Sequence, residues 1–157
     1  MAKDALQTLQ KTWDRMRILP GGKRAFSKIV GRMAPYTGTI EPKVRELRKG
    51  YAKVQMKDKK IVRNHLSSIH AVALVNLAEV LSGLAFSYSL PPKSRAILTG
   101  ISIEYLKKAR GTLTAECHSV IPESNEKAEY EIGVTTRDQQ GDIVTVAKAQ
   151  WLVGPLR

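Results

Sequence analysis

Apolar residues recur at helical spacing in the first part of the chain. Two short segments show the pattern, and their apolar members are Leu6, Leu9, Trp13 and Met16 in the first, and Phe26, Ile29, Val30 and Met33 in the second. The turn at Pro20-Gly21-Gly22 ends the first segment, and Pro35 ends the second. Neither helix would be stable in isolation. We therefore expect residues 1–35 to form a helical extension that packs on a domain spanning residues 36–157.

From residue 40 onward the pattern changes to alternation, which is typical of strands with one wet face. Residues 40–62 predict two strands, because Ala52, Val54 and Met56 alternate with polar neighbours. Four further runs follow Pro91-Pro92, and their face-sharing residues are Ile97, Ile101, Ile103 and Tyr105; Leu113, Ala115 and Cys117; Ala128, Tyr130, Ile132 and Val134; and Ile143, Ala147, Ala149 and Trp151. Turns at Gly111 and at residues 138–142 predict a hairpin meander.

Between these strands lies a segment that predicts a buried helix. Nearly every residue from Ile69 to Phe86 is apolar or small, with Ser67 or Ser68 as the expected N-cap. A mostly apolar helix needs a concave apolar surface, so we predict an α+β fold in which an antiparallel sheet wraps around a long central helix. Glu79 interrupts the apolar surface, and a buried carboxylate is costly unless it is paired or functional.

Composition narrows the function classes. The chain has 157 residues and a formal net charge of +12, which favours anionic partners. The single cysteine, Cys117, lies in a strand pattern and is expected to be a core thiol. The N-terminus lacks an apolar signal core and no run reaches the length of a membrane span, so we expect a cytoplasmic protein with no membrane span. No residue grouping has metal-ligand spacing or resembles a nucleophile elbow.

Three spacings together resemble a known family. They are Asn64-x5-His70, His70-x8-Glu79 and the segment Ser102–Gly111. Over about residues 40–153 the chain is similar to the hotdog-fold thioesterases of the phenylacetic-acid-degradation type, and looks closest to an uncharacterised hotdog subfamily. The resemblance implies a hotdog fold and an acyl-CoA thioesterase that hydrolyses a fatty or aryl acyl-CoA.

The resemblance also implies site roles. Glu79 takes the place of the acid that attacks the thioester or activates water, and Asn64 that of a polar residue that positions the reacting groups. His70 and Ala71 lie where a backbone N–H and the helix dipole polarise the thioester carbonyl. The chain departs from the family where Ala71 and Val72 replace a Gly-Gly pair, and where Glu replaces Asp.

Helix geometry predicts that the site needs two chains. Nine residues at about 100° each put His70 and Glu79 on opposite sides of one helix, so a homodimer must bring one helix start to the other chain's Glu79. Whether dimers pair further into a tetramer stays open. Asn76 and Gly83 share the Glu79 stripe and are expected to contact substrate.

The basic turn Lys107, Lys108 and Arg110 is expected to contact the phosphates of coenzyme A, which enters only as part of the substrate. No other cofactor is expected. A solvated hairpin end explains this basic turn equally well.

Other interpretations of the same residues stay open. Glu79 is alternatively a structural acid paired with a basic side chain or with Asn76 across a dimer, and His70 a helix-start residue bonded to backbone. A non-catalytic acyl-CoA or lipid binder is the main rival function. A ligand-sensing nucleic-acid regulator is a disfavoured third, and its phosphate contacts would be Lys11, Arg15, Arg17, Lys23, Arg24, Lys28 and Arg32.

Overall fold

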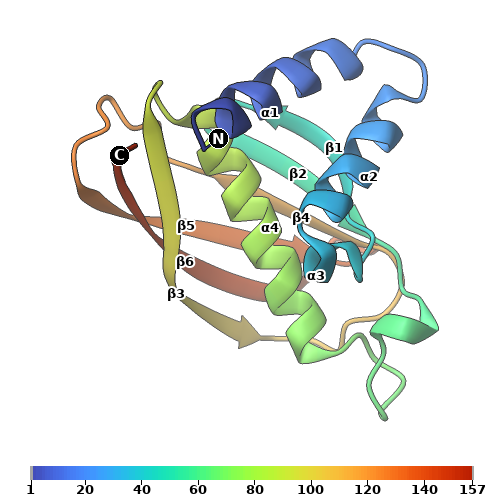
Figure 1. The fold of residues 1–157 in the computed structure, drawn as a ribbon. Coiled ribbons are helices and arrows are strands. Elements are labelled where there is room, and N and C mark those ends of the chain that lie inside the picture. The colour runs from blue at the N-terminus through green and yellow to red at the C-terminus, as the bar shows by residue number, and fades with distance from the viewer. Residues whose placement is uncertain (1, 157) are drawn as a thin grey trace.

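A curved antiparallel sheet holds one long helix against its concave face (Figure 1). The structure is a computed structural model that describes the backbone of residues 2–156 and the side chains of residues 6–156. Its helices are α1 (Ala2–Met16), α2 (Gly22–Met33), α3 (Pro35–Gly38) and α4 (Ala71–Ser89), with a 3-10 turn at Lys60–Val62. Its strands are β1 (Lys43–Arg48), β2 (Tyr51–Met56), β3 (Ser94–Tyr105), β4 (Leu113–His118), β5 (Ala128–Arg137) and β6 (Ile143–Pro155).

The predicted α+β class is confirmed, with a six-stranded sheet in the order β1-β2-β4-β5-β6-β3. The core lies between this sheet and α4, where Leu77, Leu81 and Phe86 are fully buried. Cys117 is buried there too, and burial raises the pKa of its thiol to about 12, as expected of a core cysteine. By length and composition α4 is apolar enough to cross a membrane, but 61% of its most apolar window is buried inside the fold.

The N-terminal helices join this core. The Trp13 ring packs against Phe26 with centroids 5.0 Å apart, and both side chains are buried. The Trp13 indole N–H donates to the Leu47 carbonyl of β1 over 2.7 Å. Helices are therefore found where residues 1–35 predict them, and they share apolar contacts with the sheet domain. The division at residue 35 stays a prediction.

Strand pairing corrects the expected meander. β4, β5 and β6 do follow one another as neighbours, but β3 pairs with β6 and lies at the far edge of the sheet. The segment between β3 and β4 is therefore a crossover and not a hairpin turn. Gly111 lies in this crossover with a φ of 71°, a left-handed conformation that favours glycine.

Two β-bulges change which side of the sheet some residues face, so part of the predicted face assignment is wrong. The β3–β6 register shifts between Leu98 and Gly100, and that of β5–β6 shifts between Thr136 and Arg137. An extra residue in one strand reverses which face its neighbours occupy. Ile97 and Ile143 therefore leave the faces predicted for them and are 54% and 36% exposed.

The start of α4 also differs from the prediction. His70 is the N-cap, and its Nδ1 accepts a hydrogen bond from the Val72 amide over 3.0 Å. Ser67 has a φ of 54° outside the helix, and the Ser68 hydroxyl donates to the Ala109 carbonyl. The two serines thus shape the preceding loop, because His70 fills the capping position itself.

Candidate functional site

Two loops meet at the N-terminal end of α4. The Ile69 amide donates to the Ala109 carbonyl over 2.8 Å, and the Ser68 hydroxyl donates to the same oxygen over 3.1 Å. These bonds tie the loop before α4 to the crossover after β3. The predicted residues Asn64, His70 and Ala71 therefore share one end of the fold with Lys107, Lys108 and Arg110, although the two groups are far apart in sequence.

Asp58 strengthens this junction, although no sequence pattern marks it as a site residue. Its carboxylate accepts from Arg63 Nε over 2.6 Å and from the Gly111 amide over 2.9 Å. Burial opposes ionisation of Asp58, but the hydrogen bonds from Arg63 and Gly111 outweigh it and lower its pKa. Asp58 thus holds the crossover in place as an ionised anchor.

Asn64 organises the loop before α4. Its Oδ1 accepts from the amides of Leu66 and Ser68 over 2.9 and 3.2 Å, which is the bonding of an Asx turn. The backbone N–H of Asn64 closes the turn by donating to the Ser68 carbonyl. The side-chain oxygen of Asn64 is therefore engaged within the loop, and the side-chain NH2 group remains for orienting a ligand.

His70 and Ala71 form the exposed first turn of α4. Because His70 Nδ1 accepts a hydrogen bond, the neutral ring carries its proton on Nε2, which is free to donate outward. The backbone N–H of Leu74 donates a hydrogen bond to the His70 carbonyl. Within residues 2–156 the amides of Ala71 and Ala73 donate no hydrogen bond. Free amides at a helix N-terminus are suited to a developing oxyanion.

Tyr105, a residue missed as a site candidate, contacts this same turn from the end of β3. Its hydroxyl donates to the Ala71 carbonyl over 3.1 Å, and burial raises the pKa of its phenol. Tyr105 and Val72 are each 49% exposed. An apolar surface therefore borders the helix start at the free edge of the sheet.

A small pocket of about 330 Å³ adjoins the helix start. It is lined by Tyr36, Thr39, Ile40, Ile61, Val62, Arg63, His70, Val72, Ala73 and Asn76. Asn76 is buried, and its Nδ2 donates to the Tyr36 carbonyl over 3.1 Å. Two predicted residues, His70 and Asn76, thus face one cavity, whose volume is at the low end for a small-molecule site.

Glu79 lies apart from the helix start, about 13 Å along the α4 axis from His70 for a rise of 1.5 Å per residue. Its side chain is half-buried, and burial raises the pKa of the carboxyl group. Within the described side chains of residues 6–156, no hydrogen bond or ion pair reaches this carboxylate. Glu79 is thus a desolvated acid, held neither by Asn76 nor by any basic side chain among those described.

The packing beside Glu79 involves Trp151 of β6. A Cβ at Gly83 would lie 3.3 Å from the Trp151 ring, so the ring occupies the space next to this glycine. The Trp151 indole N–H donates to the Ser82 hydroxyl, which in turn donates to the Glu79 carbonyl. In one chain, the absence of a side chain at Gly83 makes room for Trp151.

The three basic residues of the crossover differ in their bonding. Lys107 Nζ contacts Asp138 and Asp142 over 2.5 and 2.7 Å, so its charge is committed to the β5–β6 turn. Lys108 and Arg110 are exposed, and within the described residues no ion pair holds either of them. These two are the cations that remain for an anionic ligand near the helix start.

Solved structures with the same architecture include proteins named as thioesterases. The structural-genomics protein APC5556 has a TM-score of 0.81 at 29% identity, covering 96% of this chain and 98% of that one. A Pseudomonas aeruginosa protein of unknown function, described as a probable thioesterase, has a TM-score of 0.76 at 22% identity, covering 87% and 97%. A Streptococcus mutans protein bound to acetyl-CoA has a TM-score of 0.63 at 22% identity, covering 74% and 90%.

These similarities, together with the sheet order and the central helix, define the chain as a hotdog-fold protein of the type found in thioesterases. The chain belongs to the family described as a domain of unknown function, DUF4442, which it matches over residues 22–153. No match is found among curated proteins. The family match begins at the first residue of α2, so it includes part of the predicted N-terminal extension.

Proposed function

We propose that this protein is a cytoplasmic acyl-CoA thioesterase that works as a homodimer. The observation that carries the proposal is Glu79, a half-buried carboxylate with a raised pKa and no partner among the side chains described for residues 6–156. A carboxylate kept desolvated in this way is typical of a general base or nucleophile. The fold shared with proteins named as thioesterases, one of them bound to acetyl-CoA, supports a thioester as the substrate.

The free sheet edge supports the dimer. β3 has 12 residues and pairs on one side only, and a long exposed edge is a template for pairing with another chain. Exposed apolar side chains border it, with Val72 and Tyr105 each 49% and Leu106 57% exposed. Pairing two β3 edges across a twofold axis brings the two α4 helices together. The Glu79 of each chain then faces the helix start of the other.

Ala71, Glu79 and Asn64 each carry out a different part of the hydrolysis. The free Ala71 amide at the start of α4 holds the thioester carbonyl and stabilises the oxyanion that forms on it. Glu79 of the other chain takes a proton from water as the water oxygen attacks the carbonyl carbon. The C–S bond then breaks, the proton passes to the thiolate, and a free acid and coenzyme A leave. Asn64 orients the reacting groups through its amide NH2.

Substrate recognition follows from the remaining cations. Lys108 and Arg110 contact the phosphates of coenzyme A, whereas Lys107 keeps the crossover attached to the β5–β6 turn. The resemblance to the phenylacetic-acid-degradation type supports a fatty or aryl acyl group. We place Asn76 and Gly83 along the acyl chain in the dimer.

The test is hydrolysis of a panel of acyl-CoA esters by wild type, Glu79→Gln and a matched control, Glu129→Gln. Glu129 is an exposed acid on β5 away from the helix start. We expect Glu79→Gln to lose hydrolysis while retaining its circular dichroism and its size by gel filtration, and Glu129→Gln to match the wild type. Retained turnover in folded Glu79→Gln would contradict the assignment.

A second candidate is a non-catalytic acyl-CoA binder. It is favoured by one feature of the helix start, where the half-exposed Val72 side chain replaces glycine beside the free amides. Saturable binding of acyl-CoA esters without turnover, unchanged in Glu79→Gln, would select this function.

A further inference from the structure

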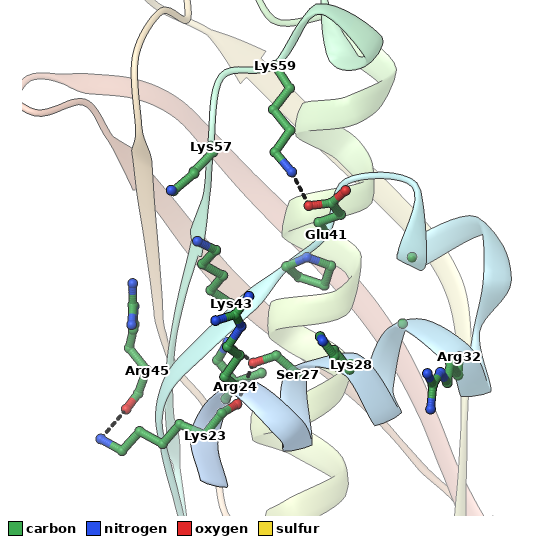
Figure 2. Close-up of a pocket in the computed structure, with 14 residues that line it drawn as sticks. Lys23, Arg24, Ser27, Lys28, Arg32, Glu41, Lys43, Arg45, Lys57 and Lys59 are labelled. Atoms are coloured by element: carbon green, nitrogen blue, oxygen red, sulfur yellow. Dashed lines mark hydrogen bonds and ion pairs between the residues drawn. The ribbon is translucent and has the colours of Figure 1, made fainter. Parts of the chain in front are cut away.

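A large basic groove lies beside α2, and its lining shares no residue with that of the pocket at the start of α4. The groove lies between α2 on one side and β1 with the segment after β2 on the other, and has a volume of about 750 Å³ (Figure 2). Its lining includes eight cationic side chains, which are Lys23, Arg24, Lys28, Arg32, Lys43, Arg45, Lys57 and Lys59. The only acid in the lining, Glu41, is already paired with Lys59. The groove therefore carries a large net positive charge.

The cations of the groove are held close to one another. Burial and the neighbouring charge of Lys57 lower the pKa of Lys43, and Arg45 and Lys59 add to the effect. Such crowding of like charges is unfavourable without a counter-anion. Within the described residues, no ion pair reaches Arg24, Lys28, Lys43 or Lys57. An anion placed between them would relieve this repulsion and gain charge-assisted hydrogen bonds.

The groove is also built on a fixed frame. The Ser27 hydroxyl of α2 donates to the Lys23 carbonyl and accepts from the Val44 amide over 2.9 Å, which joins the helix to β1. Lys23 Nζ donates to the Arg45 carbonyl over 2.8 Å and makes a second link between the same elements. At its far end α2 packs on α3 so closely that a Cβ at Gly38 would lie 2.6 Å from the Gly31 carbonyl oxygen. The groove walls are thus set by the fold.

We propose that this groove is a second ligand site, which binds a small molecule carrying two or more phosphate groups. Its concave shape and volume suit a compact ligand, and the cations that line it come from three separate segments, α2, β1 and the stretch after β2 (Figure 2). A nucleic-acid backbone or a bilayer would instead be matched by an extended or convex basic surface. The site is independent of Glu79, which lies on α4 outside the groove lining.

The proposal is tested by calorimetric titration of the full chain with inorganic pyrophosphate at low and at physiological ionic strength. The variant is Lys43→Gln combined with Lys57→Gln, and the matched control is Lys11→Gln combined with Lys127→Gln, two exposed lysines outside the groove. We expect the groove variant to bind pyrophosphate about tenfold or more weakly, a loss of about 1.4 kcal/mol or more of binding free energy, because it lacks two charge-assisted hydrogen bonds to the phosphate oxygens. The control is expected to bind as the wild type does.

A parallel titration with coenzyme A distinguishes two sources of the phosphates. If the groove variant also weakens coenzyme A binding, the groove takes coenzyme A as its ligand and replaces Lys108 and Arg110 as the contact for its phosphates; if only pyrophosphate binding falls, its ligand is a separate phosphorylated compound. Both results support the groove site. Equal pyrophosphate binding by variant and wild type would overturn it, as would tighter, groove-dependent binding of single-stranded DNA or of anionic phospholipid vesicles. Pyrophosphate binding by Glu79→Gln tests the groove without the thioester site, and hydrolysis by the groove variant tests the thioester site without the groove. Failure of one proposal is therefore distinguishable from failure of the other.

Discussion

Trp13 offers a direct measure of how strongly the N-terminal helices stabilise the sheet domain. Its side chain is 1% exposed, packs edge-on against Phe26 and donates to the Leu47 carbonyl over 2.7 Å. Trp13→Phe keeps an aromatic ring but leaves the buried carbonyl of Leu47 without this donor, which costs about 1–3 kcal/mol. Trp13→Ala also removes the ring and costs roughly 3–5 kcal/mol. Against a total stability of about 5–15 kcal/mol, the second loss is large.

The assay is urea unfolding followed by circular dichroism and by tryptophan fluorescence. The chain has two tryptophans, so in Trp13→Phe all tryptophan fluorescence comes from Trp151 on β6, inside the sheet domain. If the helices and the sheet unfold as one unit, the two signals change together and both shift to lower urea. Tyr36→Phe is the control, because Tyr36 is an exposed aromatic of α3, and we expect its effect to stay within about 0.5 kcal/mol.

The opposite result would be easy to recognise. Early loss of helical signal, followed by a Trp151 transition at the wild-type urea concentration, would show that residues 1–35 unfold separately and contribute little to the sheet domain.

Three further predictions concern single side chains. Because burial raises the folded-state pKa of Glu79, its contribution to stability is full below the unfolded pKa of about 4.5 and is lost as the pH rises through the folded value. Glu79→Gln should therefore be more stable than wild type near pH 8, with the difference disappearing near pH 4, and a variant less stable at pH 8 would indicate a hidden partner. Loss of the cap in His70→Ala should cost about 0.5–2 kcal/mol in urea unfolding, with His70→Asn restoring most of it; an unchanged midpoint in His70→Ala would exclude the capping role. Cys117, with a pKa of about 12, should react with a thiol reagent only as fast as the chain unfolds, so rapid reaction in the native state at neutral pH would contradict its burial.

The sequence was most informative where structure depends on near neighbours. Helical spacing around Trp13 and alternation around Val54 are local patterns, and both elements are confirmed. Face assignments failed at Ile97 and Ile143, because a bulge inserts one residue and reverses the alternation without leaving a clear pattern in the sequence. The neighbour of β3 was not predictable, since a strand pattern does not specify which strand it pairs with.

The site shows the same division between local and distant information. Asn64, His70 and Ala71 were found from short spacings, and all lie at the start of α4. Asp58 and Tyr105 are not predictable as site residues, because the contacts that bring them to the site, with Gly111 and Ala71, join residues 53 and 34 positions apart in the chain. The basic groove was visible only in part. The sequence indicates its α2 residues as contacts for nucleic acid in the disfavoured interpretation, but the lysines that face them come from β1 and the segment after β2.

Glu79 differs from the other well-shielded acids that the structure describes, and this difference carries the functional argument. Asp58 and Asp138 have side chains only 10% and 9% exposed, and each forms an ion pair, with Arg63 and Lys107 respectively. Pairing lowers the pKa of each of them despite burial, so their charge stabilises the fold. Glu79 has no such partner within the described chain, and its raised pKa makes its ionised form a cost at neutral pH. Proteins keep such costs mainly at functional sites. A gain of stability together with a loss of hydrolysis in Glu79→Gln is therefore the combined result we expect, whereas a gain of stability with full activity would leave the acid without a role.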